Sequence, residues 1–313
     1  KPTDVALRCN IVTVSTDDLP YEEKTIIDHS SSEISTEDAA VLLEAVRKEL
    51  ESDIYKFYVG TSYRHLTIWD KGEVVELTPP HDVLGQVIGQ YLPKTEALRE
   101  MMKKSYDILS NHPINVERMK KGLNPANSIW FWGAGTRPAL APFVEKTGHT
   151  GAMISAVDLL KGIAVGADMK VVEVEGANGG LDTNYEGKAD AAVEALLKDD
   201  LDFAYIHLEA PDEMGHQGSF ERKVQAIENL DKRIIKRVTE QLEAAGTDFR
   251  MLVLPDHPTP VAIRTHVSDP VPYMLYDSTN KQSHTWNYNE KEAQESGNYI
   301  DKGYTIINHL FEK

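Results

Sequence analysis

The hydrophobic pattern of the first third of the chain predicts one small α/β unit. Residues 5–14 form an apolar, β-rich run, and between residues 39 and 50 the apolar positions recur at helical spacing. A Ser-Thr-Glu-Asp sequence at residues 35–38 caps the start of that helix. Short apolar runs separated by glycine predict three strands of an antiparallel or mixed sheet, at residues 55–59, 63–69 and 74–77. A second helix is expected over residues 96–109.

From residue 128 onward the pattern changes to buried-looking strands that alternate with helices. Strands are predicted at residues 129–132, 152–154, 171–174, 203–206 and 251–254, and helices at residues 187–197 and 220–244. This order favours a mostly parallel sheet with helices on both faces, and such sheets bind ligands beyond the carboxyl ends of their strands. A polar segment with glycine and proline at 120–125 predicts two domains, over residues 1–125 and 126–313.

Composition and charge narrow the class of protein. The 313 residues include 50 acidic and 33 basic side chains, and the formal net charge of −17 repels nucleic acid. The single cysteine, Cys9, cannot form an intrachain disulfide, which is typical of a reducing compartment. No apolar run approaches the roughly 18 residues that span a bilayer. We therefore expect a cytoplasmic protein that binds neither nucleic acid nor membranes, and the sequence indicates no oligomeric state.

Dense polar clusters follow two of the predicted strands. Asp212 and His216 come shortly after the strand at 203–206, and their four-residue spacing puts them on one face of a helical turn. Asp256 and His257 follow the strand at 251–254, and His266 comes nine residues later. Each pair alone is common on protein surfaces. Together, at the ends of strands of one sheet, they predict a metal site.

The donor set indicates which ions and which reaction to expect. Carboxylates and imidazoles without thiolates suit Mn²⁺ or Zn²⁺, with Mg²⁺ and Co²⁺ as further candidates. Five protein ligands exceed what one catalytic ion takes while it keeps a coordination position open, so two ions are expected. Two-metal sites are typical of displacement at phosphorus, because both the attacking and the leaving oxygen carry developing charge.

Candidates for binding a substrate's negative charge lie mostly in the first domain. An arginine binds phosphate or carboxylate with two parallel hydrogen bonds, whereas a lysine supplies a point charge. The candidates are Arg8, Arg64 with the neighbouring His65, His81, Arg137 and Lys161. Any one of them alone is more often a solvated surface residue, so the set is a hypothesis at this point.

These motifs resemble those of the archaeal-type 2,3-bisphosphoglycerate-independent phosphoglycerate mutases of the alkaline phosphatase superfamily. The resemblance rests on residues 210–216, 254–260, 264–266 and 269–272. It extends to the Arg8-Cys9-Asn10 motif and to residues 62–66, 125–130, 154–162 and 182–188. It implies an alkaline-phosphatase-like α/β domain, incomplete at its N-terminus, together with a smaller α/β domain that caps the substrate.

The resemblance also implies an activity and a role for each site residue. Enzymes of this family interconvert 3- and 2-phosphoglycerate through a phosphoserine and do not need bisphosphoglycerate. By motif, one divalent ion would be held by Asp212, His216 and His266, and a second with the help of Asp256 and His257. Substrate would be bound by Arg8, Asn10, Arg64, His65 and Arg137. Lys161 would offset charge in the transition state.

Two departures from the family pattern leave alternatives open. The family's nucleophilic serine and one metal-binding aspartate lie upstream of the Arg8-Cys9-Asn10 motif, and residues 1–7 match neither. We therefore expect either a preceding segment or a non-catalytic, metal-dependent protein that binds metabolites. Glu33 stands where many members have a histidine, as in a bacterial branch labelled homoserine kinases. A phosphotransferase that acts on homoserine is the alternative activity.

Overall fold

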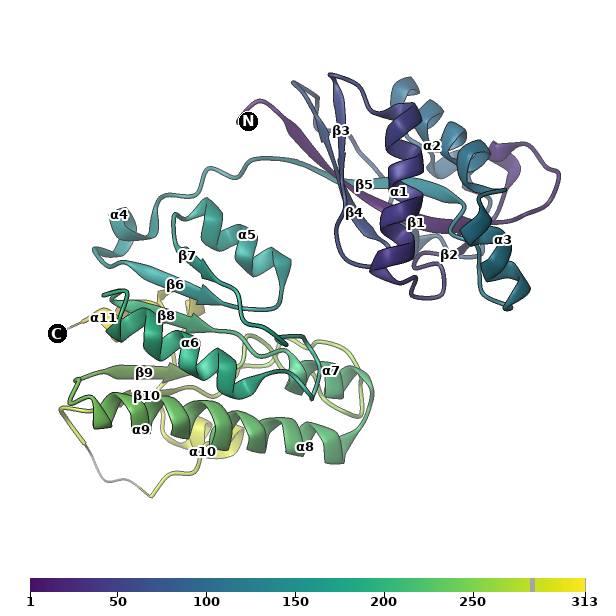
Figure 1. The fold of residues 1–313 in the computed structure, drawn as a ribbon. Coiled ribbons are helices and arrows are strands. Elements are labelled where there is room, and N and C mark those ends of the chain that lie inside the picture. Colours follow the sequence, from purple (N-terminus) through teal and green to yellow (C-terminus); the bar gives the residue numbers. More distant parts are fainter. Residues whose placement is uncertain (282–284, 313) are drawn as a thin grey trace. The chain divides into compact units, whose positions relative to one another are not determined.

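The computed structural model describes residues 1–281 and 285–312, and it divides into two compact units, Lys1–Pro138 and Ala139–Lys313 (Figure 1). Each unit has its own strands and its own hydrophobic core. Among the described residues, no helix has the length and apolar composition that a membrane crossing requires.

The first unit is built around one long central strand, β1 (Val5–Val14). Two antiparallel neighbours, β4 (Arg64–Trp69) and β5 (Ser128–Thr136), pair with opposite edges of β1. The outer strands are β2 (Ile26–Asp28), which pairs with the end of β1, and β3 (Tyr55–Tyr58), which pairs with β4. The sheet is therefore antiparallel throughout, as the short predicted strands indicate.

The core of this unit lies between one face of the sheet and its helices. The helices are α1 (Thr36–Leu50), α2 (Glu96–Leu109) and α3 (Pro113–Lys120). The predicted cap of α1 is present, because Ser35 Oγ accepts a 3.2 Å hydrogen bond from the Asp38 N–H. Fully buried members of the core include Leu7, Cys9, Ile11, Leu42, Leu43 and Met102. Burial raises the pKa of the Cys9 thiol to about 12, so this thiol stays protonated.

Two predictions for the first unit are wrong. Residues 129–132 do not open the second domain, because they lie in β5 and pair with β1. The boundary between the units consequently falls after Pro138 rather than after residue 125. This run reads like a strand of a parallel sheet because Ile129, Trp130 and Phe131 are all buried. Residues 74–77 form no strand.

The second unit contains a parallel three-stranded sheet and a separate antiparallel pair. Strands β6 (Gly151–Ile154), β7 (Lys170–Val172) and β8 (Phe203–Ile206) pair in the order β7-β6-β8, and both contacts are parallel. β9 (Arg250–Val253) was expected in the same sheet but instead pairs antiparallel with β10 (Met274–Asp277). The predicted parallel sheet is thus confirmed for three of its strands.

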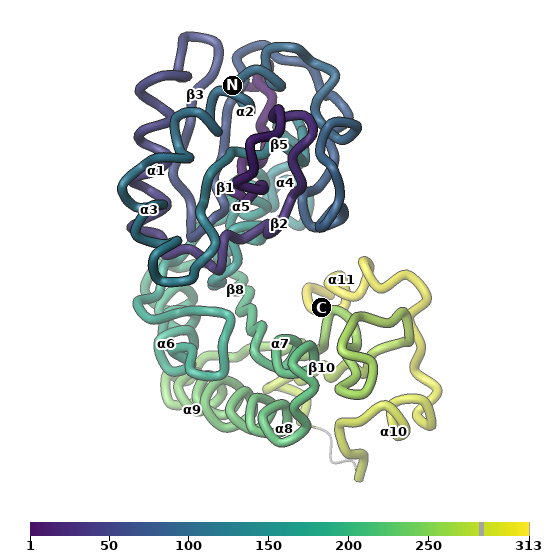
Figure 2. Tube along the Cα trace, turned by 90° about the vertical axis from the view of Figure 1, so that its right-hand side faces the viewer, coloured from purple at the N-terminus to yellow at the C-terminus, as the bar shows by residue number. Residues whose placement is uncertain are grey.

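Helices flank these strands and connect them. They are α4 (Phe143–Thr147), α5 (Asp158–Gly166), α6 (Tyr185–Leu197), α7 (Ala210–His216), α8 (Phe220–Asn229), α9 (Lys236–Ala244), α10 (Glu290–Glu295) and α11 (Ile306–Phe311). The helix predicted at 220–244 comprises α8, a π-helical segment (Leu230–Ile235) and α9. Both views place α6 alongside α9 (Figure 1; Figure 2), and Tyr185 and Val193 pack there against Val238 and Leu242.

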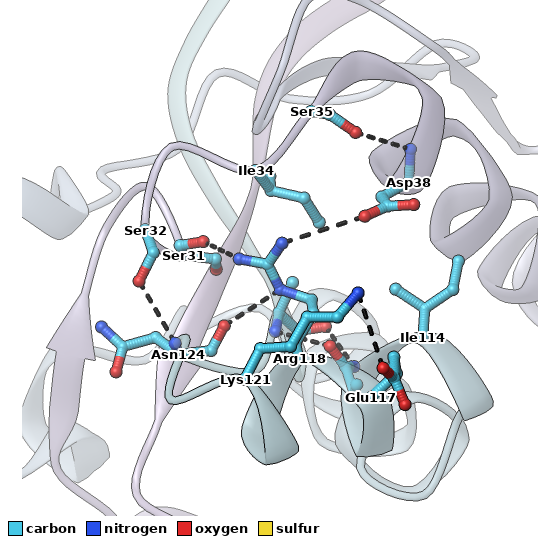
Figure 3. Close-up of polar contacts among 12 residues, drawn as sticks. Ser31, Ser32, Ile34, Ser35, Asp38, Ile114, Glu117, Arg118, Lys121 and Asn124 are labelled. Carbon is cyan, nitrogen blue, oxygen red and sulfur yellow. Dashed lines mark hydrogen bonds and ion pairs between the residues drawn. The ribbon is translucent and has the colours of Figure 1, made fainter.

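A strained turn follows β2 in the first unit. Ser31, Ser32 and Glu33 have φ values of 51°, 55° and 48°, in the left-handed region that non-glycine residues rarely occupy. The buried side chain of Arg118, from α3, holds this turn (Figure 3). Its guanidinium donates to the Ser31 carbonyl and, from Nε, to the Asn124 carbonyl at 3.1 Å.

The carboxylate of Asp28 closes the same turn from the other side. It accepts hydrogen bonds from the Ser30 N–H at 2.9 Å, the Ser32 N–H at 2.6 Å and the Asn124 amide at 2.9 Å. Burial alone would raise the pKa of the Asp28 carboxyl, but these hydrogen bonds outweigh burial and lower that pKa to about 2. The carboxylate is therefore ionised at neutral pH and fixes the backbone around His29.

We predict that Arg118→Ala lowers the free energy of unfolding of the first unit by about 2–4 kcal/mol, because the Ser31 carbonyl in the strained turn and the Asn124 carbonyl after α3 both lose their donor. Lys121→Ala is the matched control, since Lys121 is exposed and makes only a 3.5 Å ion pair with Glu117 one helical turn away; its effect should stay within about 0.5 kcal/mol. Urea unfolding followed by tryptophan fluorescence measures both. Equal effects of the two substitutions would contradict the role given to Arg118.

Candidate functional site

The short helix α7 supplies two of the predicted metal ligands. It begins four residues after β8 ends, with Pro211 in its first turn, where proline is compatible with a helix. Asp212 and His216 are one helical turn apart, and His216 Nε2 lies 3.3 Å from Asp212 Oδ2. The four-residue spacing therefore brings the carboxylate and the imidazole together as the sequence predicts.

The third ligand of this cluster, His266, comes from the long loop that follows β9. Its Nε2 atom lies 3.3 Å from Asp212 Oδ1 and 3.0 Å from His216 Nε2. One ligand atom from each of the three side chains lies within 4.8 Å of the other two. The fold thus brings together three donors that are up to 54 residues apart in the chain.

Hydrogen bonding fixes which nitrogen of His216 can bind a cation. Its Nδ1 atom lies 3.0 Å from the carbonyl oxygen of Arg264. A carbonyl can only accept, so Nδ1 carries the hydrogen and the lone pair of Nε2 faces Asp212 and His266. Arg264 itself has a left-handed φ of 59°, and a Cβ on Gly218 would lie 2.3 Å from its Nε atom. Gly218 itself has a left-handed φ of 69°, so glycine is the favoured residue at this position beside the Arg264 side chain.

The other predicted pair, Asp256 and His257, lies directly beside this cluster. The ring of His257 stacks on that of His266 with centroids 3.7 Å apart, and His257 Nε2 lies 3.3 Å from Asp256 Oδ2. Thr259, which the sequence reasoning missed, joins the two groups. Its buried hydroxyl donates to Asp212 and lies 3.3 Å from His257 Nδ1. All five predicted side chains therefore meet in one region of the second unit.

The residues fit divalent cations by their donor chemistry. A carboxylate and two imidazoles, one with its lone pair fixed by a backbone carbonyl, are donors typical of Zn²⁺ and Mn²⁺ sites. Asp256 and His257 add a second carboxylate and a third imidazole next to them. The arrangement can hold one ion between three ligands and offers two further ligands toward a neighbouring position.

A buried lysine supports the loop that leads from β8 into α7. Lys188, from α6, is fully buried; its Nζ donates to the His207 carbonyl at 3.0 Å and lies 3.4 Å from Glu209 Oε2. Burial lowers the pKa of Lys188 and that of His207. Sequence reasoning gave Lys188 no role, although it lies in a motif of the family resemblance.

Three of the substrate candidates share one face of the first unit's sheet. Arg8 and Asn10 are two residues apart on β1, and Arg64 is the cross-strand partner of Asn10 on β4. The Arg8 guanidinium lies 4.6 Å from the ring centroid of Trp132. Asn10 is engaged within the protein, because its Oδ1 accepts from Trp132 Nε1 at 3.0 Å and its amide nitrogen donates to the His29 carbonyl at 3.4 Å.

The remaining candidates lie elsewhere. His65 pairs with Cys9, so its side chain points to the core face, away from Arg8 and Arg64, and burial lowers its pKa to about 4. The structure thus separates His65 from the two arginines. Arg137 is exposed just after β5. Lys161 lies on α5 of the second unit, where its Nζ is 2.7 Å from Glu173 Oε2.

Comparison with known proteins relates the chain to metal-dependent enzymes. Residues 59–312 match the family model of the metalloenzyme superfamily, and residues 1–115 match the model of 2,3-bisphosphoglycerate-independent phosphoglycerate mutase. A protein of that name from Methanosarcina barkeri is 46% identical over 94% of this chain and 73% of its own length. Another from Methanothrix thermoacetophila is 40% identical over 98% of this chain and 76% of its own length.

Solved structures agree with these sequence matches. A protein from Pyrococcus horikoshii has a TM-score of 0.74 at 26% identity, over 94% of this chain and 69% of that one. A cofactor-independent phosphoglycerate mutase from Thermoplasma acidophilum has a TM-score of 0.60, over 99% of this chain and 77% of its own. At 23% identity, the second likeness speaks for the fold alone.

We predict that His216→Ala lowers the amount of Zn²⁺ or Mn²⁺ bound per chain and weakens the remaining affinity at least about tenfold, because one of three ligands of the cluster is lost. His309→Ala is the matched control, since that histidine is also exposed but pairs with Glu312 on α11. Metal content after equilibrium dialysis measures both. Unchanged metal content in His216→Ala, with the fold intact by circular dichroism, would contradict the site.

Proposed function

The chain belongs to the family of 2,3-bisphosphoglycerate-independent phosphoglycerate mutases, and we propose that it carries out this chemistry with two divalent ions, Mn²⁺ or Zn²⁺. The reaction interconverts 3- and 2-phosphoglycerate without bisphosphoglycerate as a cofactor. The substrate is accordingly a small phosphorylated metabolite. The observation that carries the proposal is the convergence of Asp212, His216 and His266 with the neighbouring Asp256–His257 pair.

In this proposal each unit has a distinct task. The second unit holds the ions, with Asp212, His216 and His266 as ligands of one and Asp256 and His257 as ligands that help to hold the other. When bound, such ions stabilise the charge that develops on the attacking and leaving oxygens of a phosphoryl group. Thr259 positions the Asp212 carboxylate by its hydrogen bond, and the Arg264 carbonyl keeps the His216 lone pair aimed at the cluster.

The first unit supplies substrate binding in the proposal and acts as the capping domain. Arg8 and Arg64 would each bind a carboxylate or phosphate through two parallel hydrogen bonds, and Arg137 would add a third guanidinium. Asn10 would act by positioning Trp132, since its amide is already engaged with that ring and with the His29 backbone. His65 is left out of the set, because it is buried on the other face of the sheet.

The phosphoryl group would pass through a serine and return to the other hydroxyl of the glycerate. In the family pattern that serine lies upstream of the Arg8-Cys9-Asn10 motif, so the activity is to be tested on the complete gene product. Lys161 would offset charge in the transition state. It is now paired with Glu173, whose side chain is largely exposed, so the ion pair is weak enough to be exchanged for a substrate oxyanion.

We predict that the complete gene product converts 3-phosphoglycerate to 2-phosphoglycerate when Mn²⁺ is present and bisphosphoglycerate is absent. An enolase-coupled assay measures the rate. Chelation by EDTA should abolish the activity, and renewed Mn²⁺ should restore it, because the ions carry the charge stabilisation. Phosphorylation of homoserine by ATP without any mutase activity would instead identify the alternative phosphotransferase, and metal-dependent metabolite binding without either turnover would identify a binding protein.

We also predict that Lys161→Met lowers kcat about 100-fold with little change in KM, because a charge that acts mainly in the transition state is removed. Lys170→Met is the matched control: Lys170 lies nearby on β7 and forms a 2.6 Å ion pair with Asp199. The same coupled assay, run over a range of substrate concentrations, measures kcat and KM of both variants. A rise in KM alone would reassign Lys161 to ground-state binding.

A further inference from the structure

A continuous row of rings crosses one face of the first unit, with a guanidinium at each end. The ring centroids of Trp132 and His81 are 5.3 Å apart, and His81 lies 6.1 Å from His29. The ring of His29 lies 5.7 Å from that of Tyr63. Arg8 stacks 4.6 Å from the Trp132 centroid, and Arg64 stacks 4.6 Å from the Tyr63 centroid. We call these four rings, Trp132, His81, His29 and Tyr63, the ring row.

The ring row is assembled from segments that are distant in the sequence. Trp132 is the cross-strand partner of Arg8, on β5 and β1. His29 directly follows β2, and His81 lies in the short 3-10 helix Pro80–Asp82. The Arg118 and Asp28 contacts hold the strained turn that begins just after His29. The fold therefore fixes the backbone that follows His29 by hydrogen bonds that do not use its ring.

The row keeps hydrogen-bonding groups without partners in the protein. Within the part of the chain that the structure describes, the buried Nδ1 atom of His29 has no hydrogen-bond partner. Buried polar atoms are nearly always paired in folded proteins, so an unpaired one at a surface row points to a bound ligand or water. His81 is half-exposed and has one charged neighbour, Asp82, at 3.6 Å from its Nε2.

The charges around the ring row favour the binding of an anion, although the chain as a whole carries a formal net charge of −17. Neither Arg8 nor Arg64 forms an ion pair with any residue that the structure describes. A guanidinium that stacks on a ring keeps its in-plane N–H groups available, which is the geometry for binding carboxylate or phosphate. Among the described residues, Asp82 is the one carboxylate that forms an ion pair with a ring of the row, and its own side chain is largely exposed.

We infer that the ring row is a recognition site for a small phosphorylated hydroxy acid, in which His29 and His81 bind the hydroxyl and determine specificity while the two arginines bind the charged ends. The inference rests on the proposed function, because it takes phosphoglycerate as the ligand. It goes further by assigning the two histidines to the hydroxyl, the uncharged group that distinguishes phosphoglycerate from other phosphorylated carboxylates of its size. Trp132 serves as the platform that carries both Arg8 and His81.

The test compares two ligands on matched variants of the complete gene product. The ligands are 3-phosphoglycerate and the phosphate ester of 3-hydroxypropionate, here called 3-phosphopropionate, which carries the same carboxylate and phosphate ester but lacks the hydroxyl. We expect the unchanged protein to bind 3-phosphoglycerate at least about tenfold more tightly, because the analogue leaves hydrogen-bonding groups unpaired. His81→Phe keeps a ring but removes its nitrogens. This variant should therefore bind the two ligands about equally tightly, and its affinity for 3-phosphopropionate should be retained. Isothermal titration calorimetry measures the affinities of both ligands for the unchanged protein and for His81→Phe.

Further variants separate specificity from folding. His29→Phe should act like His81→Phe, and His81→Gln should restore part of the preference, because its amide can hydrogen-bond again. Arg8→Met should weaken both ligands alike. His112→Gln is the control, since His112 is a histidine of the same unit that caps α3 and makes no contact with the row.

Two outcomes would overturn the inference, and they are distinguishable. A protein that binds neither ligand, with its metal content intact, overturns the proposed function as well. A protein that prefers 3-phosphoglycerate, and keeps this preference in the folded His81→Phe and His29→Phe variants, overturns only the assignment of the histidines.

Discussion

The structure depends on one electrostatic constraint, the meeting of a carboxylate and two imidazole nitrogens within hydrogen-bonding distance of one another. Asp212 contributes negative charge, and the His216 lone pair is aimed at the same space because its other nitrogen donates to a backbone carbonyl. Such a group of donors is best satisfied by a divalent cation.

Among the described residues, four of the eight non-glycine residues with a positive φ lie where polar side chains are held in place. Arg264 adopts a left-handed conformation beside Gly218, and its carbonyl sets the tautomer of His216. In the first unit, three consecutive left-handed residues follow His29 and are fixed by Arg118 and Asp28. In both units strain accompanies a polar cluster rather than the apolar core, as expected where positioning of side chains outweighs local backbone preference.

The convergence of the candidate metal ligands could be predicted from the sequence only in part, and the surroundings of the substrate candidates could not be predicted from it. Asp212 and His216 share a helical face at a fixed spacing, so a local pattern suffices for this pair. Asp256 and His257 follow β9, which pairs with β10 outside the parallel sheet, so a shared sheet edge does not explain their approach to the pair. Three successive buried residues, Ile129, Trp130 and Phe131, are typical of a strand in a parallel sheet, but β5 is antiparallel and, among the described strands, pairs only with β1. His65 follows Arg64 in sequence, but alternation along β4 sends the two side chains to opposite faces. Thr259 and His29 gave no spacing signal at all.

The account is tested most directly by anomalous X-ray diffraction from a crystal of the protein soaked in Mn²⁺. It predicts two anomalous peaks in the second unit, one within about 2.0–2.2 Å of ligand atoms of Asp212, His216 and His266, the other beside Asp256 and His257. A crystal in which the five side chains keep their positions and no peak lies among them, at a Mn²⁺ concentration that supports activity, would contradict the central claim.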